Sequence, residues 1–219
     1  MPDIDFLVTW VDGSDPSHAA ARAQFREEDE PPSRGGDETR FRNNGEIYYL
    51  IASILKYAPF VRRIRIITDN QKPPLLDSFV SAGLCDPAFI ELVSHDTIFR
   101  DLDVARPTFN SRVIEAAMWR SPGLSEHFIY ANDDMFLNAP VSADDFFRRG
   151  RPVLQGEMLR PSDRRLKMRL RRFAGGVVGW RDQRPKHWIA QEVCSQLAGM
   201  TDGFFHVLHR PHPLRHSVM

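Results

Sequence analysis

The chain has 219 residues, of which 42% are hydrophobic and 26% are charged. This length fits one domain, or one domain with an appendage, and is sufficient to bury a large core. The 29 Lys and Arg residues balance 29 Asp and Glu residues, so the net charge gives no general attraction to nucleic acid, and we expect no nucleic-acid partner.

Cysteine content and hydropathy restrict the location of the protein. Cys85 and Cys194 are too few for a disulfide framework and lack the spacing of metal ligands, which suits a reducing cytosol. Asp3 and Asp5 follow the first residue closely, so we expect no signal peptide. No apolar run reaches the ~20 residues that a membrane span needs. We predict a cytoplasmic protein without a transmembrane segment, with peripheral contact at the inner face of the membrane left open.

Strand and helix signals alternate along the first part of the chain. Residues 4–11 predict a buried strand, which the turn at 12–16 closes. A short helix and a loop follow over 17–42. Asn44 is the predicted N-cap of a helix with apolar residues at helical spacing, which ends before Pro59.

The same alternation continues to the middle of the chain. Residues 63–69 and 89–95 predict two further strands, and Thr108 is the predicted cap of a helix that ends near 121–123. Another buried strand follows at 128–130. Strands that alternate with helices predict an α/β fold with a mostly parallel sheet flanked by helices on both faces.

The pattern changes after residue 140. A short helix over 143–149, an edge strand over 152–156, a basic helical segment and a helix over 186–197 are expected. We therefore predict an α/β core over 1–149. Residues 150–219 are predicted to form a helical, basic appendage that ends in a His-rich segment and belongs to the same catalytic domain.

The most informative stretch is 127–136, in which an apolar strand runs into Asn132, Asp133 and Asp134. Two adjacent carboxylates are costly to place beside a core unless a cation meets them. Ligands bind at strand ends in α/β sheets, and Mg²⁺ completes a shell of carboxylate oxygens with water and phosphate. Asp133 and Asp134 are therefore candidate ligands of Mg²⁺, or of Mn²⁺, on a nucleotide-sugar diphosphate. The alternative is a polar turn that Asp133 caps.

Three other acidic residues are candidates for the same site. Asp12 and Asp15 lie in the loop after the first strand, where doubly wound sheets bind nucleotides, although both residues also suit a simple turn. Glu115 lies on the helix before the Asp133–Asp134 strand. It either reaches the rim of the site or faces solvent.

A basic segment at 160–172 contains seven Lys or Arg residues and one Asp. Arginine matches phosphate oxygens with paired donors, so Arg169 and Arg172 are candidates for contact with a diphosphate or an anionic acceptor. Nucleic acid or an anionic membrane would also fit this segment, and a solvated helix face is the simplest alternative.

Four histidines close the chain, at 206, 209, 212 and 216. Their spacing permits metal binding, but Arg210 and Arg215 add positive charge among them and two prolines interrupt any helix. An imidazole is a natural general base for a hydroxyl nucleophile. A surface tail rich in histidine is the alternative.

The order of these features resembles the Stealth family of sugar-phosphate transferases. This family includes bacterial capsule polymerases and the animal lysosomal-enzyme N-acetylglucosamine-1-phosphotransferase. Residues 4–16, Ile-Asp-Phe-Leu-Val-Thr-Trp-Val-Asp-Gly-Ser-Asp-Pro, are similar to its first conserved region. Residues 209–215, His-Arg-Pro-His-Pro-Leu-Arg, are similar to its third. Its long second region resembles the segments 40–46, 56–62, 107–111 and 128–136.

The resemblance implies a GT-A-like (Rossmann-like) domain that transfers a hexose-1-phosphate from a UDP-sugar to an acceptor sugar hydroxyl and releases UMP. The expected donor is a UDP-N-acetylhexosamine, and the acceptor is an oligosaccharide or polysaccharide in capsular or exopolysaccharide synthesis. Asp133 and Asp134 would hold the metal ion, Glu115 would support that site, and His209 would act as the general base. The other positions expected at the substrates are Trp10, Asp12, Gly13, Asp15, Arg40, Asn44, Asn110, Asn132, Arg169, Arg172, His212 and Arg215.

Two features depart from the family pattern. Asn43 stands where the family often carries an acidic residue, and a fourth region has no counterpart before Met219. We interpret the chain as a fragment, or as a short form whose acceptor side is incomplete. Two rival functions stay open, a metal-dependent glycosyltransferase that releases UDP and a truncated, inactive nucleotide-sugar-binding module.

Overall fold

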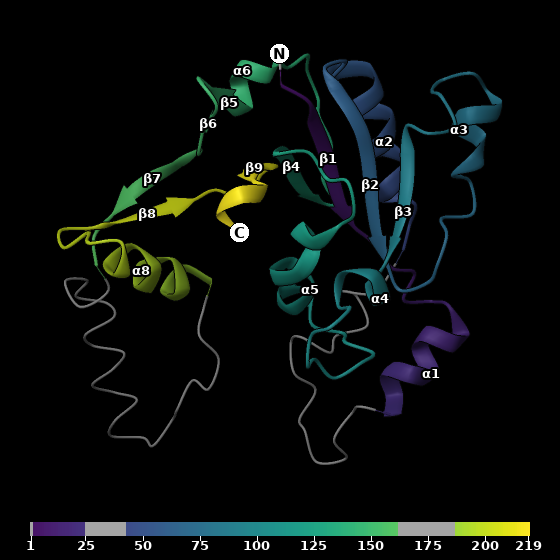
Figure 1. Cartoon of the computed structure of the whole chain (residues 1–219), viewed down its shortest axis with the longest axis horizontal. Helices are drawn as coiled ribbons and strands as arrows, with labels where there is room; N and C mark the ends of the chain where they lie inside the picture. The colour runs from purple at the N-terminus through teal and green to yellow at the C-terminus, as the bar shows by residue number, and fades with distance from the viewer. Residues whose placement is uncertain (1, 25–42, 162–186) are drawn as a thin grey trace. The chain divides into compact units, whose positions relative to one another are not determined.

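Two compact units make up the chain in the computed structural model (Figure 1). The structure describes residues 2–24, 43–161 and 187–219. The first unit comprises residues 1–153 and 211–219, and the second comprises residues 154–210.

A five-stranded sheet forms the centre of the first unit. Its order is β3-β2-β1-β4-β9, in which the first four strands are parallel and β9 is antiparallel to β4. The strands are β1 (Ile4–Thr9), β2 (Val61–Thr68), β3 (Ile90–Ser94), β4 (His127–Asn132) and β9 (His212–Arg215). The nearly continuous apolar sequences of β1 and β4 are typical of strands covered on both faces. The predicted mostly parallel α/β fold is confirmed.

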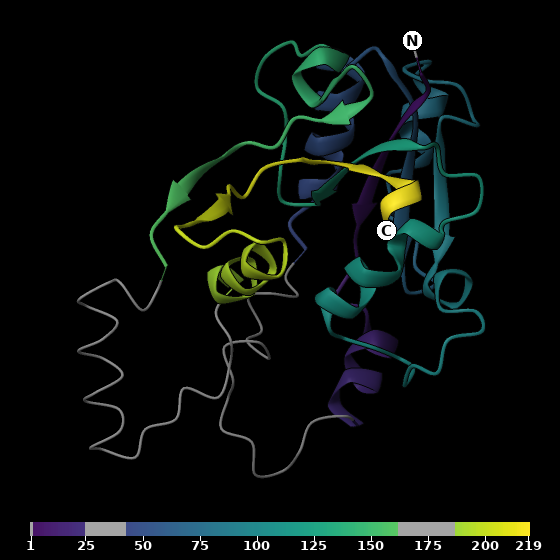
Figure 2. The ribbon, with the colours of Figure 1, turned by 60° about the vertical axis from the view of Figure 1, so that its left-hand side comes forward.

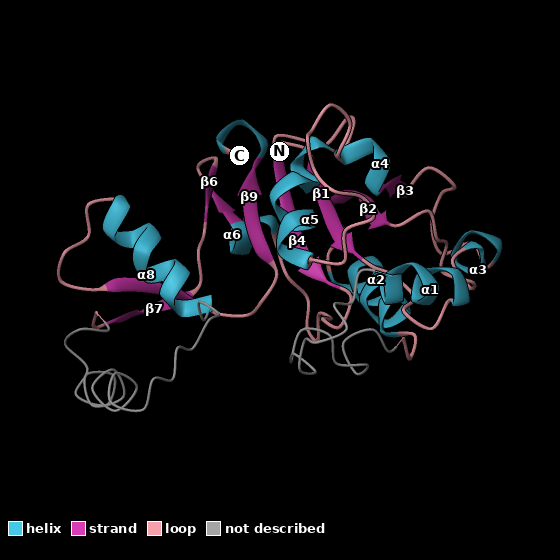
Figure 3. Ribbon diagram, turned by 90° about the horizontal axis from the view of Figure 1, so that it is seen from below, coloured by secondary structure: helices cyan, strands magenta, loops and turns pink. Residues whose placement is uncertain are grey.

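Helices cover both faces of this sheet (Figure 3). They are α2 (Glu46–Tyr57) on one face and α4 (His95–Ile98) and α5 (Ser111–Ala117) on the other. Side chains alternate between the faces along β1. Phe6 and Val8 belong to the hydrophobic cluster with α2, and Leu7 belongs to the cluster with α4 and α5.

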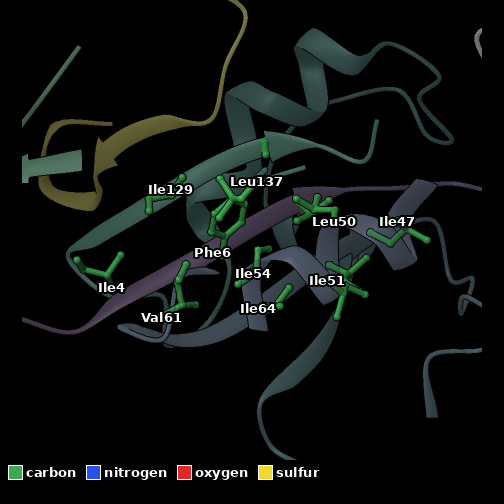
Figure 4. Packing of buried hydrophobic residues seen from close by; sticks show 14 of the residues in the cluster. Ile4, Phe6, Ile47, Leu50, Ile51, Ile54, Val61, Ile64, Ile129 and Leu137 are labelled. Carbon is green, nitrogen blue, oxygen red and sulfur yellow. The ribbon is translucent and has the colours of Figure 1, made fainter. Parts of the chain in front are cut away.

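The larger core lies between the sheet and α2 (Figure 4). Phe6 on β1 and Leu137 pack with a helical stripe of fully buried residues, which are Ile47, Leu50, Ile51 and Ile54. Each such side chain contributes about 1.5–3 kcal/mol when it leaves water. This stripe explains why the periodicity of the sequence predicts the helix correctly.

β1 and β4 are neighbours whose carboxyl ends coincide. Thr9 pairs with Asn132 in their parallel register. The chain builds β2 and β3 on one side of β1 and then returns to place β4 on the other side. Such a reversal leaves a crevice outside the carboxyl ends of the strands, which is where open α/β sheets bind ligands.

The other elements are short. In the first unit they are α1 (Pro16–Gln24), α3 (Asp77–Ser81), the 3-10 helices η2 (Met118–Arg120) and η4 (His216–Val218), α6 (Ala143–Phe146), β5 (Phe147–Arg148) and β6 (Arg151–Pro152). In the second unit, an antiparallel pair is formed by β7 (Gly156–Leu159) and β8 (Phe204–Val207), and the helix is α8 (His187–Leu197).

Two predicted helix caps are wrong. Gly45, with φ of 84°, is the N-cap of α2, because the Asn44 amide donates to Glu46 Oε1 (2.9 Å) instead of capping the helix. Asn110 caps α5 in place of Thr108, since its side-chain oxygen accepts a backbone N–H of the first turn (3.1 Å).

The predicted helix over 143–149 is wrong after Phe146. Arg149 and Gly150 both have positive φ (52° and 72°) and join β5 to β6, as in a two-residue hairpin turn. The predicted edge strand over 152–156 is divided between β6 and β7.

The C-terminal residues also differ from the prediction. The appendage predicted as helical contains α8 together with the two-stranded β7–β8 sheet. Residues 211–219, predicted to belong to it, return to the main sheet and supply β9 (Figure 2). Pro213 is tolerated there because β9 is an edge strand. The predicted basic helix lies outside the described residues from residue 162 onward.

The buried carboxylate of Asp5 joins β1 to β2 and to the residue that leads into β4. It accepts hydrogen bonds from Arg62 (2.8 and 2.7 Å), from Arg65 Nε (3.3 Å) and from the backbone N–H of Ser125 (2.9 Å). Its own backbone N–H donates to Ser125 Oγ (2.9 Å). Burial raises the pKa of Asp5, but these hydrogen bonds and positive charges outweigh burial and leave the pKa below its ordinary value.

We expect Asp5→Asn to destabilise the protein by about 3 kcal/mol or more at neutral pH, because it removes one partner of a buried ion pair. Since the folded-state pKa is depressed, this stabilisation is present above the unfolded pKa of about 4 and is lost as the pH falls through the folded value. Urea unfolding of both proteins from neutral to acid pH measures the difference.

The matched control is Asp3→Asn. Asp3 lies 3.5 Å from the same Arg62 but is exposed, so its loss should change stability by less than about 1 kcal/mol. Equal effects of the two substitutions would show that burial does not decide the contribution of Asp5.

Candidate functional site

Two predicted acidic segments emerge at the same edge of the sheet. Residues 12–15 follow β1, and residues 133–134 follow β4 directly. Because β1 and β4 are parallel neighbours that end in register at Thr9 and Asn132, both segments leave the sheet at its carboxyl edge, where open α/β sheets bind ligands. The cavity beside residues 12–15 is not lined by Asp133 or Asp134.

The loop after β1 is a turn held by its own side chains. The carboxylate of Asp12 accepts hydrogen bonds from Ser14 N (2.9 Å) and Ser14 Oγ (2.6 Å), and the carbonyl of Asp12 accepts from Asp15 N (3.2 Å). Gly13 is buried within the turn. Asp15 caps α1 by accepting from His18 N (2.9 Å). The predicted turn-forming role of Asp12 and Asp15 is confirmed.

Both carboxylates of this loop stay ionised at neutral pH. Hydrogen bonds from Ser17 and His18 lower the pKa of Asp15. Burial raises the pKa of Asp12, but hydrogen bonds from Ser14 and from the side chain of Asn43 outweigh it and leave the pKa below its ordinary value. Two negative charges repel phosphate and suit donors such as ribose hydroxyl groups.

A cavity of about 570 Å³ opens beside the loop. This volume lies within the range of small-molecule and cofactor sites. Its walls include three predicted substrate residues and three from the segment after β2, namely Trp10, Asp12, Asp15, Asp69, Gln71 and Lys72. The sequence analysis did not identify the β2 segment, since its polar residues follow a strand without any motif of their own.

Asp133 carries the most perturbed carboxylate of this edge. It is partly buried, and burial together with the negative charges of Asp134 and Glu46 raises the pKa of Asp133 to about 6. No basic side chain of the described residues forms an ion pair with Asp133 or Asp134. The negative charge at the end of β4 is therefore uncompensated within the described protein.

Glu46 is a site residue that the sequence analysis missed. It is the first residue of α2, and its carboxylate accepts hydrogen bonds from Asn44 N (2.8 Å) and Asn44 Nδ2 (2.9 Å), which lower its pKa. The negative charge of Glu46, 87 residues away in the sequence, contributes to the raised pKa of Asp133. The available signal was its place within the segment 40–46, which resembles the family, directly before the helix.

The two adjacent carboxylates fit a hard cation. Carboxylate oxygens without a basic partner are the ligands that Mg²⁺ or Mn²⁺ accepts, and Mg²⁺ typically takes one or two carboxylates and completes its shell with water and phosphate. Among the residues that the structure describes, no three His, Cys, Asp or Glu side chains form a metal-binding group. Asp133 and Asp134 could therefore hold the ion only with oxygens from a ligand or water.

Glu115 and Asn132 meet at the buried hydroxyl of Tyr130. The Tyr130 oxygen lies 2.7 Å from Asn132 Oδ1, 3.2 Å from Glu115 Oε1 and 3.2 Å from Thr9 Oγ1. Burial raises the pKa of Tyr130 above its ordinary value, and the charge of Glu115 adds to the rise. The phenol therefore stays protonated and can orient either oxygen partner, so Glu115 lies beside the carboxyl end of β4 rather than in open solvent.

The predicted C-terminal residues fall into different parts of the structure. His209 is exposed and belongs to the second unit, whereas His212 begins β9 opposite Tyr130. Arg215 ends β9 in an ion pair with Glu126 (2.8 Å), and its predicted contact with the substrates stays a prediction. Three predicted phosphate or substrate contacts, Arg40, Arg169 and Arg172, lie outside the described residues.

Comparison with known proteins decides the family. The model of Stealth protein conserved region 2 matches residues 40–153, which is more than half of the chain, and that of conserved region 1 matches residues 2–30. The chain belongs to the Stealth family. Asp12 and Asp15 fall within region 1, and Asp133 and Asp134 fall within region 2. The resemblance of 209–215 to a third Stealth region stays a prediction.

Several similar proteins are named as polysaccharide phosphotransferases. The capsular polysaccharide phosphotransferase cps1A of Actinobacillus pleuropneumoniae is 44% identical over 148 residues, which cover 67% of this chain and 38% of that protein. The exopolysaccharide phosphotransferase SCO2592 of Streptomyces coelicolor is 42% identical over 66% of this chain and 15% of its own length. The exopolysaccharide phosphotransferase CpsY of Mycobacterium tuberculosis is 38% identical over 68% of this chain and 26% of its own length. The chain therefore matches well under half of these relatives.

No helix within the described parts of the chain combines the length and the apolar character needed to cross a bilayer.

We expect Asp133→Asn to stabilise the metal-free protein at neutral pH. The pKa of Asp133 is about 6 in the folded protein against an ordinary 3.8. The free energy of unfolding therefore falls as the pH rises from the lower value to the higher one, and the full loss is present above it. Removing the charge should raise stability by about 1–3 kcal/mol near pH 8 in the presence of a chelator. The gain should shrink as the pH falls toward 5, which thermal unfolding measures.

Asp103→Asn, at an exposed position, is the control for this substitution and should leave stability unchanged. If Asp133→Asn instead destabilises the protein equally at both pH values, the carboxylate is a structural hydrogen-bond acceptor and not a strained charge.

Proposed function

We propose that this chain carries the nucleotide-sugar site of a Stealth phosphotransferase. In this proposal it transfers a hexose-1-phosphate from a UDP-sugar, with a UDP-N-acetylhexosamine as the expected donor, to a hydroxyl of an oligosaccharide or polysaccharide. The uncompensated carboxylates of Asp133 and Asp134 at the β1–β4 crevice carry the proposal, since they call for a cation and an anionic ligand at that point. The names of the relatives support a role in capsular or exopolysaccharide synthesis.

The proposed chemistry is attack at phosphorus. The acceptor oxygen forms a bond to the phosphorus next to the sugar, the anhydride P–O bond breaks, and UMP leaves. The anomeric bond of the sugar stays intact, so no carboxylate nucleophile toward carbon is needed. A bound Mg²⁺ or Mn²⁺ would neutralise charge on the diphosphate, as metals do in phosphoryl transfer.

The described residues have separate roles in this proposal. Asp133 and Asp134 hold the metal ion, while Asp12 and Asp15 face the nucleoside from the cavity wall. Glu115 acts through Tyr130 and Asn132 and is therefore a positioning residue.

Other predicted residues would contact the phosphates and the acceptor. Arg169 and Arg172 stay the proposed phosphate partners, and Arg40 stays a proposed substrate contact. His209 is the proposed base that takes the acceptor proton, with His212 as the alternative. We place the reaction in the bacterial cytoplasm, at the inner face of the membrane or away from it.

The direct test is a product assay with a panel of UDP-sugars, Mg²⁺ or Mn²⁺ and oligosaccharide acceptors. Formation of UMP with label from the donor phosphorus in the product supports phosphotransfer. Formation of UDP indicates a glycosyltransferase. Binding of UDP-sugar without release of either nucleotide indicates an inactive binding module.

We expect Asp134→Asn to remove most activity and to weaken metal-dependent UDP-sugar binding while the fold stays intact. Asp134 is exposed, so neutralising it should disturb packing little. Calorimetric titration with UDP-sugar, with and without Mg²⁺, separates the metal-dependent part of the affinity. An unchanged affinity in the presence of Mg²⁺ would remove Asp134 from the metal site.

We expect His209→Ala to lower turnover by roughly a hundredfold or more, the usual range for a lost general base, with little change in donor affinity. The acidic limb of the pH–rate profile should disappear with it. His216→Ala is the matched control, because His216 is also exposed and its ring lies against Trp119 (5.7 Å). If turnover of His209→Ala is near normal, His212 becomes the candidate.

A further inference from the structure

The side chain of Gln71 extends the pairing of β1 and β2 beyond the ends of both strands. The last backbone hydrogen bond between them runs from Trp10 N to Ile67 O (2.9 Å). Gln71 then supplies the next two, because its Oε1 accepts from Asp12 N (2.7 Å) and its Nε2 donates to Asp12 O (3.0 Å). A carboxamide carries the same donor and acceptor groups as a peptide bond. The Gln71 side chain therefore pairs with the Asp12 backbone as the backbone of a longer β2 would.

These two bonds differ from the others that hold the loop. The bonds among residues 12–15 fix the shape of the turn but not its position on the sheet. The bonds from Gln71 attach the backbone of Asp12 to the chain that follows β2. The bond from Gln71 Nε2 ends at the Asp12 carbonyl, which also accepts from Asp15 N, so one atom joins the turn to its anchor.

Gln71 also lines the cavity of about 570 Å³ together with Asp12 and Asp15. A displacement of the Asp12 backbone would move both carboxylates relative to this cavity, since the turn shifts as one piece. Groups that must meet a ligand have to be held within a fraction of an ångström, and supporting hydrogen bonds provide that restraint.

We propose that Gln71 is a positioning residue that holds the residue 12–15 loop in place for the nucleoside part of the donor. The inference rests on the proposed function, because it assumes that this cavity receives a nucleotide. It predicts that loss of the carboxamide weakens nucleotide binding without touching the reacting atoms, so the donor KM should rise while kcat stays nearly constant.

Gln71→Met tests the proposal, since it keeps the side-chain length and removes both hydrogen bonds. In the ligand-free protein, hydrogen exchange at the Asp12 amide should become about tenfold faster or more, because two bonds of about 1 kcal/mol each are lost. The Kd for UDP with Mg²⁺ and the donor KM should rise by a similar factor. Gln71→Glu keeps the acceptor but sets a carboxylate against the Asp12 carbonyl, so it should impair binding at least as strongly.

Gln196→Met is the matched control, because Gln196 is an exposed residue of α8 in the second unit. It should leave exchange, Kd and KM unchanged. Unchanged exchange in Gln71→Met, faster exchange with normal UDP affinity, or a fall in kcat at constant KM each overturns the positioning role. If the unsubstituted protein binds no UDP or UDP-sugar, the proposed function fails first and the inference fails with it.

Discussion

The register between β1 and β4 depends on the buried carboxylate of Asp5. This group accepts from two arginines of β2 and from the backbone of Ser125, just before β4 begins. Arg62 and Ser125 lie at the amino ends of β2 and β4, Arg65 lies in the middle of β2, and the parallel register carries this alignment along to Thr9 and Asn132. The site at the opposite edge exists because these two strands end side by side.

Buried or partly buried carboxylates are paired with arginines at the amino edge of the sheet but lie beside other carboxylates at the carboxyl edge. At the amino edge, Asp5 lies among Arg62 and Arg65, and the latter also pairs with Glu91 (2.7 Å). At the carboxyl edge, burial raises the pKa of Asp133 to about 6 with like charges beside it. Such an arrangement lowers the stability of the fold, and it is the reason we propose that a positively charged ligand completes it.

Sequence patterns predicted those parts of the fold that local residues determine. β1, β2, β4 and α2 follow from apolar periodicity, and the Asp133–Asp134 pair follows from its place after a strand. The N-cap of α2 was predicted incorrectly because Asn44 donates hydrogen bonds to the Glu46 carboxylate instead of capping the helix, and Gly45 takes the N-cap position. β9 and the contribution of Glu46 depend on contacts between residues more than 80 positions apart, which no local pattern encodes.

Gln71 shows why such sites are only partly readable from sequence. An isolated glutamine after a strand carries no motif, yet its carboxamide pairs with the Asp12 backbone 59 positions away. The residues that would touch a ligand, such as Asp12 and Asp133, have recognisable chemistry and fall within the matched Stealth regions. The residues that hold them, such as Gln71, Tyr130 and Asp5, act through geometry alone. The carboxylates of the candidate site can therefore be recognised from the sequence, whereas the side chains that we propose hold them in place are found only in the folded structure.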